Sequence, residues 1–142
     1  VGSHRYALPV EAVREVINTA DRREIPGVDR WIGGLLDVRG QVISILDLIV
    51  LFGAGEGAGE TVASYIILTR VDKQRESQLA IRVERVLQVS EIEDKALRSV
   101  PDAFTGVDRE YFNGVIHRGD ELVLIASPDA LFAQAVPASR VA

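Results

Sequence analysis

The side chains best suited to acid–base or nucleophilic chemistry are two aspartates, Asp37 and Asp47, and two histidines, His4 and His117. A pair of carboxylates could transfer protons to and from a substrate. However, no third catalytic group and no set of metal ligands accompanies the aspartates, and the histidines are far apart with no metal-ligand spacing. No nucleophile-elbow pattern marks a catalytic serine. Ion pairing or helix capping is therefore the interpretation that we favour for both aspartates.

Three glycines in the first third of the chain, Gly33, Gly34 and Gly40, could indicate a loop that cradles a phosphate group. They match neither the Gly-x-Gly-x-x-Gly pattern of dinucleotide-binding folds nor the Gly-Lys-Ser/Thr ending of a P-loop. The chain has no cysteine, which excludes disulfides and thiolate metal sites. We therefore assign these glycines to turn geometry, and we predict a protein without enzymatic activity, cofactor or metal.

An arginine on a predicted turn, Arg39 followed by Gly40, is better suited to binding than to catalysis. Its planar guanidinium has several donors and fits carboxylates or backbone carbonyls of a protein partner. It could equally pair with Asp37, Asp47 or Glu15 and fix the turn, and the two roles are compatible. The residue types leave both interpretations open.

These residues belong to one stretch, residues 33–53, that organises the rest of the chain. Its β-branched run from Gln41 to Leu46 predicts a strand, which Asp47 closes. The segment from Leu48 to Phe52 is too short for a full helix and is predicted to end at Gly53. The arginine thus lies on a turn beside a buried strand, a position from which it can meet a partner.

The rest of the chain shows mainly strand patterns. Strands are predicted at His4–Leu8, after a turn within Val10–Ile17, at Val62–Val71, at Leu79–Val83 with a continuation to Val89, at Tyr111–His117 and at Glu121–Ala126. The last two are joined by a tight turn at Gly119-Asp120 and form the clearest hairpin. In the strand at residues 79–83 the apolar residues alternate with Ala80 and Arg82, which predicts a half-buried strand with Arg82 on its other face.

The charged segment Asn18–Pro26 is predicted to be a loop, and the charged segment Asp72–Ser77 a hairpin loop. Ser127 and Pro128 are suited to the N-cap and the first residue of a C-terminal helix. Several short strands at close spacing, with glycine turns and little helix, indicate an all-β barrel or sandwich.

Composition indicates one domain of 142 residues that can bury a proper core, since 47% of the residues are hydrophobic. The net charge of -5 argues against nucleic-acid binding, which usually requires a basic patch. No apolar run approaches the roughly 18 residues of a transmembrane helix, and no signal peptide is visible. With the absence of cysteine, this predicts a cytoplasmic protein that does not insert into membranes. The absence of methionine suggests that the chain starts after the native N-terminus.

Two segments, Gly34–Gly40 and Val42–Gly53, resemble the signature of CheW-type chemotaxis coupling domains. That signature runs Gly-x-x-Asn-Leu-Arg-Gly, then an aliphatic strand with a proline, then Asp-Leu and a short helical turn. Further matches lie at Tyr6–Val10, Val13–Val16, Ile25–Pro26, Ile81–Val86, Phe112–Val115 and Leu122–Ile125. The order and spacing of these motifs make the resemblance specific, and it covers nearly the whole chain. The departures are Asp37 for asparagine, Ser44 for proline and Glu84 for aspartate, and the first strand of the family is mostly missing.

The resemblance implies a single domain over residues 1–142, built from two SH3-like β-barrel lobes packed together, with short helical turns and a C-terminal helix. It implies a non-enzymatic adaptor that couples the cytoplasmic tip of a chemoreceptor, a long helical hairpin, to the regulatory domain of a CheA-type histidine kinase. The positions that match the receptor-binding surface are Val13, Glu15 and Arg39. The motif positions with a structural role are Gly34, Asp37, Gly40 and Asp47.

The sequence is also compatible with two functions other than a stand-alone adaptor. One is a CheW-like regulatory domain of a larger kinase or of a receiver-fused coupling protein. The other, and the weakest, is a small-ligand enzyme.

Overall fold

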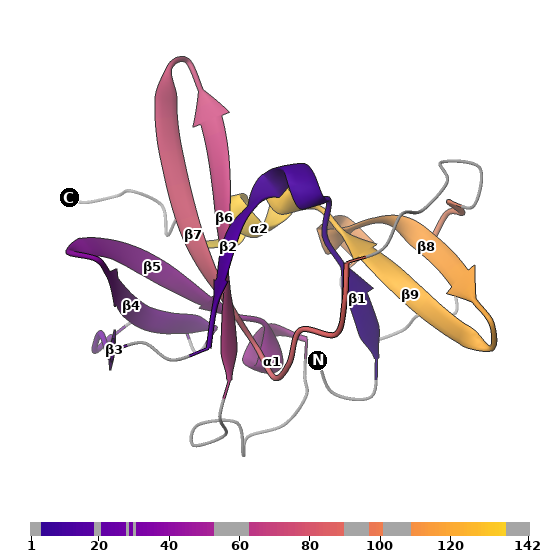
Figure 1. Ribbon diagram of the computed structural model, residues 1–142, viewed down its shortest axis with the longest axis horizontal. Coiled ribbons are helices and arrows are strands. Elements are labelled where there is room, and N and C mark those ends of the chain that lie inside the picture. The colour runs from indigo at the N-terminus through magenta and orange to yellow at the C-terminus, as the bar shows by residue number, and fades with distance from the viewer. Residues whose placement is uncertain are drawn as a thin grey trace.

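The computed structural model describes residues 4–18, 21–27, 29, 31–52, 63–89, 97–100 and 109–135. These residues form two β-sheets with few helices (Figure 1). The strands are β1 (Arg5–Ala7), β2 (Val13–Ile17), β3 (Asp21–Arg23), β4 (Ile32–Val38), β5 (Gln41–Asp47), β6 (Ser64–Asp72), β7 (Arg75–Val83), β8 (Phe112–Arg118) and β9 (Glu121–Ala126). The helices are η1 (Val10–Ala12), α1 (Leu48–Leu51), η4 (Arg109–Tyr111) and α2 (Pro128–Ala135).

The large sheet has the strand order β2-β6-β7-β5-β4-β3 and curls around its own core. This barrel core consists of Leu36, Ile43, Ile45, Tyr65, Ile67 and Ala80. Ile17 on β2 and Val38 on β4 both pack against it, although β2 and β4 stand near opposite ends of the strand order. A flat sheet could not bring them to one cluster, so the sheet is wrapped into a barrel-like lobe.

The small sheet, in the order β1-β9-β8, packs against the large one through a second core. This seam core takes buried residues from β5, β6 and β7, from β8 and β9, and from α2. In Figure 1 the two sheets lie on opposite sides of the view with α2 between them. The predicted all-β fold of two packed SH3-like lobes, with short helical turns and a C-terminal helix, is confirmed.

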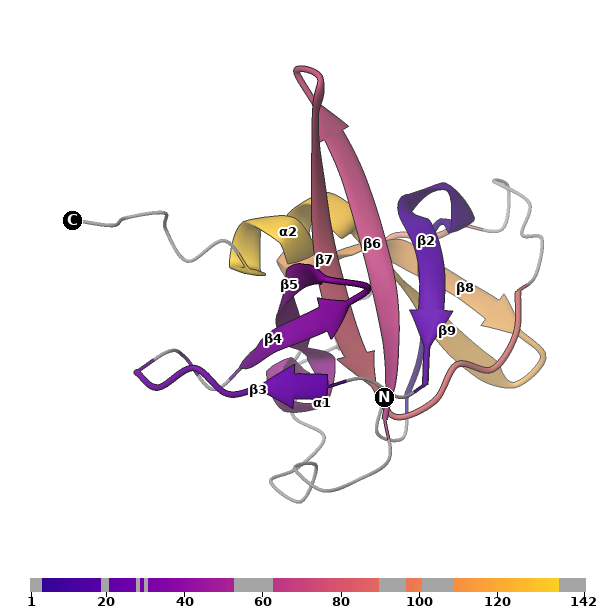
Figure 2. The same cartoon turned by 60° about the vertical axis from the view of Figure 1, so that its left-hand side comes forward.

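The hairpin of β6 and β7 is longer than the sequence patterns indicate. Its two strands pair from Ser64–Val83 to Asp72–Arg75, which leaves only Lys73 and Gln74 in the turn. The hairpin projects beyond the rest of the molecule (Figures 1 and 2). The hairpin predicted at residues 72–77 is confirmed, but its predicted loop is too long, because cross-strand pairing continues through charged residues that remain exposed.

Two further predictions about elements are wrong. The segment from Asn18 to Pro26 contains the strand β3, which pairs with Leu35–Asp37 on β4 despite its polar composition. The strand predicted to continue to Val89 ends at Val83, and the apolar side chains beyond it are exposed. In both places tertiary pairing, and not local composition, decides where the strand lies.

Several local predictions are confirmed. A turn precedes β2, and β8 and β9 form the expected hairpin around Gly119 and Asp120. The helix α2 starts at Pro128, and the Ser127 hydroxyl accepts a hydrogen bond from the Ala130 amide at 3.3 Å. The short helix predicted after Asp47 is α1, while its predicted terminator Gly53 lies outside the described residues.

Four aromatic rings join the end of α1 to the small sheet. Phe52 lies 4.8 Å from Tyr6, 5.2 Å from Phe112 and 5.9 Å from Tyr111, measured between ring centroids. Tyr6 belongs to β1, and Phe112 is the first residue of β8. This aromatic cluster therefore connects the chain segment that follows β5 with both edges of the small sheet.

Burial in this cluster raises the pKa of the Tyr6 phenol above its ordinary value of 10.0. Because the fold favours the protonated phenol, its contribution to stability is fully present below pH 10 and is lost as the pH rises through the folded-state pKa. We expect Tyr6→Phe, which keeps the ring, to lessen the fall in stability above pH 10. Urea unfolding at a series of alkaline pH values measures this, and equal slopes for the two proteins would contradict it.

Candidate functional site

Arg39 lies in the two-residue turn that joins β4 to β5. Val38 and Gln41 close the hairpin, and Arg39 and Gly40 between them have φ of 51° and 82°. Positive φ at both central residues is the geometry of a type I′ turn, whose twist matches that of the flanking strands. Asp37 fixes the turn, because its Oδ1 accepts a hydrogen bond from the Gly40 amide at 3.2 Å. The predicted turn is confirmed, and it presents Arg39 at the end of a paired hairpin.

Glu15 is the carboxylate that Arg39 meets, among the three considered from the sequence. Arg39 Nη2 donates to Glu15 Oε2 and so links the β4–β5 turn to β2. The Arg39 side chain is 74% exposed and that of Glu15 is 24% exposed. An ion pair as open as this contributes at most about 1 kcal/mol to stability. Since the guanidinium has five N–H donors, it can bind a further acceptor while it remains paired with Glu15.

Val13 lies on the same strand as Glu15. Val13, Glu15 and Ile17 are half-buried, whereas Arg14 and Val16 between them are exposed. Val13 packs against the seam core, and a register shift separates it from Glu15 in the pairing of β2 with β6. The Val13 side chain therefore packs in the protein. From the sequence, both a packing role and a receptor-binding role were possible for it.

Gly34 on β4 lies where only glycine fits. Its φ is +105°, and a Cβ at this position would lie 2.0 Å from the carbonyl oxygen of Arg23. Glycine is needed both for the backbone conformation and for the close approach of the chain around β3. The glycine of the motif thus shapes the hairpin that carries Arg39.

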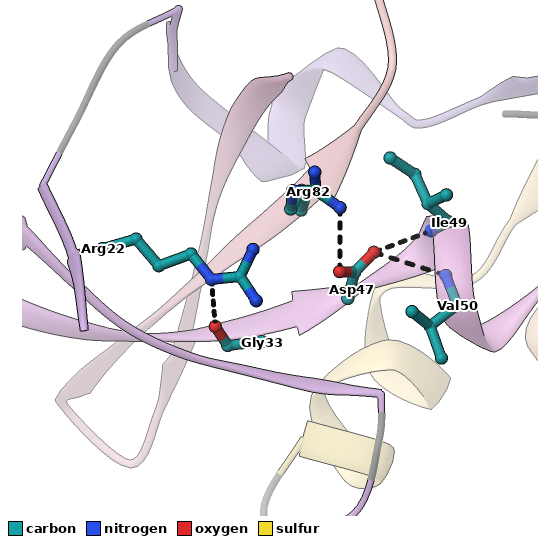
Figure 3. A network of polar contacts seen from close by, with 6 residues as sticks. All are labelled: Arg22, Gly33, Asp47, Ile49, Val50 and Arg82. Carbon is teal, nitrogen blue, oxygen red and sulfur yellow. Dashed lines mark hydrogen bonds and ion pairs between the residues drawn. The ribbon is translucent and has the colours of Figure 1, made fainter. Parts of the chain in front are cut away.

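Asp47 is the centre of a buried polar network (Figure 3). Its Oδ1 accepts hydrogen bonds from the backbone amides of Ile49 at 3.0 Å and Val50 at 3.3 Å, so it is the N-cap of α1. Its Oδ2 accepts a hydrogen bond from Arg82 Nη1 at 3.0 Å. Sequence reasoning left ion pairing and capping as alternatives for Asp47, and the structure shows that it does both.

Arg82 is the residue of this network that sequence reasoning missed. The prediction of a half-buried strand is wrong at this position, because the Arg82 side chain is only 2% exposed. β7 is covered on both faces, and its pairing partners at this point are Asp47 on β5 and Tyr65 on β6. A charged residue flanked by Ile81 and Val83 was the available sequence signal of a buried ion pair. Its partner, Asp47, could be found only from the parallel pairing of β5 with β7.

Comparison with known proteins shows the family to which this chain belongs. The family model described as the CheW-like domain matches residues 1–136. The chain belongs to the CheW-like domain family. Chemotaxis protein CheW of Treponema pallidum (strain Nichols) is 25% identical over 132 residues, which cover 93% of this chain and 78% of that protein. Chemotaxis protein CheW of Rhizobium meliloti (strain 1021) is also 25% identical over 132 residues, covering 93% of this chain and 83% of the relative.

A solved CheW structure shares the fold of this CheW-like domain. The scaffolding protein TtCheW from Thermoanaerobacter tengcongensis superposes with a TM-score of 0.77 at 24% identity, over 92% of this chain and 81% of that one. The family and the names of the relatives support a chemotaxis coupling adaptor and do not favour a regulatory domain of a larger kinase. In the part of this CheW-like domain that the structure describes, no helix has the length and apolar character needed to cross a membrane.

Proposed function

We propose that this CheW-like domain is a non-enzymatic adaptor that couples the cytoplasmic tip of a chemoreceptor to the regulatory domain of a CheA-type histidine kinase. Membership of the family and relatives named as chemotaxis proteins support the coupling function. The proposal includes the two partners and the cytoplasmic location that binding to a cytoplasmic receptor tip requires. The adaptor needs neither cofactor nor nucleic acid for this task.

The receptor contact is assigned to Val13, Glu15 and Arg39. The observation that carries this assignment is the open ion pair between β2 and the β4–β5 turn, in which a largely exposed guanidinium is held at a fixed place by Glu15. Its remaining donors suit a carboxylate or the carbonyls at the tip of a helical hairpin. Half-buried Val13, two residues before Glu15 on β2, supplies apolar surface beside the charges.

The kinase domain is assigned to other exposed strand and loop surfaces of the two lobes. A protein built from two packed lobes can bind a helix at one surface and a second domain at another sheet edge or loop. Both partners can then be bound at once. This property distinguishes an adaptor from a protein whose two partners compete for one surface.

Arg39→Ala is expected to weaken binding to a chemoreceptor tip about tenfold or more, because it removes charge-assisted hydrogen bonds to the partner. The free energy of unfolding should fall by less than about 1 kcal/mol, since the pair with Glu15 is exposed. Calorimetric titration and urea unfolding measure the two effects.

Arg14→Ala is the matched control for Arg39→Ala. Arg14 is also an exposed arginine, and it pairs with Glu76 at 2.7 Å on the same lobe. Removing it should leave receptor binding within a factor of about two. If Arg39→Ala lowers stability strongly while the folded fraction binds the tip normally, Arg39 has only a structural role.

Titration with both partners tests the adaptor function itself. We expect the domain to bind a receptor tip and a kinase regulatory domain separately, and to form a ternary complex when both are present. Binding of the receptor tip alone would contradict the coupling role, and failure to bind either folded partner would overturn the proposed function.

A further inference from the structure

The helix α1 is too short to be stable by itself. It has four residues, Leu48–Leu51, whereas isolated helices need roughly 12–15 residues to form in water. Burial of Leu48 and Ile49, and the capping hydrogen bonds that the Asp47 carboxylate accepts, therefore keep it in place. The two capping bonds share a single carboxylate oxygen, Oδ1 of Asp47.

What fixes that carboxylate is the ion pair with Arg82. Oδ2 faces Nη1 of Arg82 at 3.0 Å, and the two side chains are 4% and 2% exposed. Figure 3 shows the guanidinium and the two capped amides on different sides of the carboxylate, so that both oxygens are engaged. Arg82 on β7 thus sets the orientation of the Asp47 carboxylate, and this carboxylate caps α1.

The helix in turn carries the chain into the seam between the lobes. Phe52 directly follows α1, and its amide donates to the Leu48 carbonyl at 2.9 Å. The Phe52 ring stacks on Tyr6 of β1 and contacts Phe112 of β8. A change in the position of α1 is therefore passed to both outer strands of the small sheet.

Stability alone is a poor explanation for a charge pair in this place. Desolvating two charges costs several kcal/mol each, and well-packed apolar residues of similar volume are often as stable as a buried ion pair. Ala80, on the same face of β7 as Arg82, is apolar and buried in the barrel core. An apolar side chain at position 82 would extend this core, but it would not orient the Asp47 carboxylate.

We propose that the buried Asp47–Arg82 pair is a positioning device that holds α1 and, through Phe52, fixes the orientation of the small sheet relative to the large one. The device is internal to this chain and operates whichever partner binds. Its role is to make the domain a rigid connection between surfaces on its two lobes.

Amide hydrogen exchange on the intact protein tests this proposal. In Arg82→Met we expect the amides of Ile49, Val50 and Phe52, and those of β1, to exchange at least about tenfold faster than in the parent. The central strands β6 and β7 should keep their protection, because local opening does not require global unfolding. Arg14→Met, which breaks the exposed pair with Glu76, is the control and should leave exchange at α1 and β1 unchanged.

A second variant covers the case in which Arg82→Met fails to fold because it leaves a buried carboxylate unpaired. Asp47→Asn combined with Arg82→Met removes both charges and retains an amide oxygen that can cap α1. We expect this protein to fold and to show the same local acceleration at α1 and β1. Parental protection at these amides, or acceleration spread evenly over all strands, would overturn the proposal.

Discussion

Ile45→Asp is expected to abolish folding of the domain. The side chain is 0% exposed at the middle of β5 and belongs to the barrel core. Removing a buried isoleucine side chain costs about 2–5 kcal/mol, and an unpaired carboxylate in the same place costs several kcal/mol more. Together these equal a large part of the 5–15 kcal/mol by which domains are typically stable. Circular dichroism during heating should show no cooperative transition.

The neighbouring residue provides the control for this substitution. Ser44 is exposed on the same strand, so Ser44→Asp introduces the same charge one position away without burying it. We expect its free energy of unfolding to stay within about 0.5 kcal/mol of the parent. A soluble Ile45→Asp variant that melts cooperatively would show that this side chain does not face the barrel core.

Gly34→Ala is expected to have the next largest effect, a loss of about 3 kcal/mol or more in the free energy of unfolding. The new methyl group would lie 2.0 Å from the Arg23 carbonyl oxygen, a backbone atom that can move only if the chain around β3 moves. The φ of +105° adds a further penalty for any residue with a Cβ. Urea unfolding of the purified variant measures the loss.

Gly27→Ala separates the two contributions to this loss. Gly27 also has a positive φ, +79°, but a Cβ there would meet no atom within 4 Å. It should therefore show only the backbone penalty, about 1 kcal/mol. Equal losses at Gly27 and Gly34 would mean that steric contact with Arg23 plays no part.

Large losses of stability and losses of receptor binding are thus expected at different residues. Ile45 and Gly34 build the β4–β5 hairpin, whereas the Arg39 side chain at its tip is largely exposed and contributes little to stability. A partner can therefore use Arg39 without disturbing the core that positions it.

Features that depend on residues close together in the chain can be predicted from the sequence. Glycine after Arg39 predicts a tight turn because glycine adopts positive φ without steric cost. Ser127 before Pro128 predicts the start of α2 because the cap and the amide that it accepts from are three residues apart. The β-branched run of β5 and the hairpin of β8 and β9 follow from the same local preferences.

Contacts between residues far apart in the chain become visible only in the folded protein. Arg39 selects Glu15 across 24 positions in the chain, and Asp47 reaches Arg82 across 35 positions. Arg82 is buried because both faces of β7 are covered at this point, with Ala80 on its own face in the barrel core and Ile81 on the opposite face in the seam core, and alternation in a single strand does not encode this. For the same reason β3 forms from a polar segment, since the open edge of β4 supplies the hydrogen-bonding partners that its own composition does not predict.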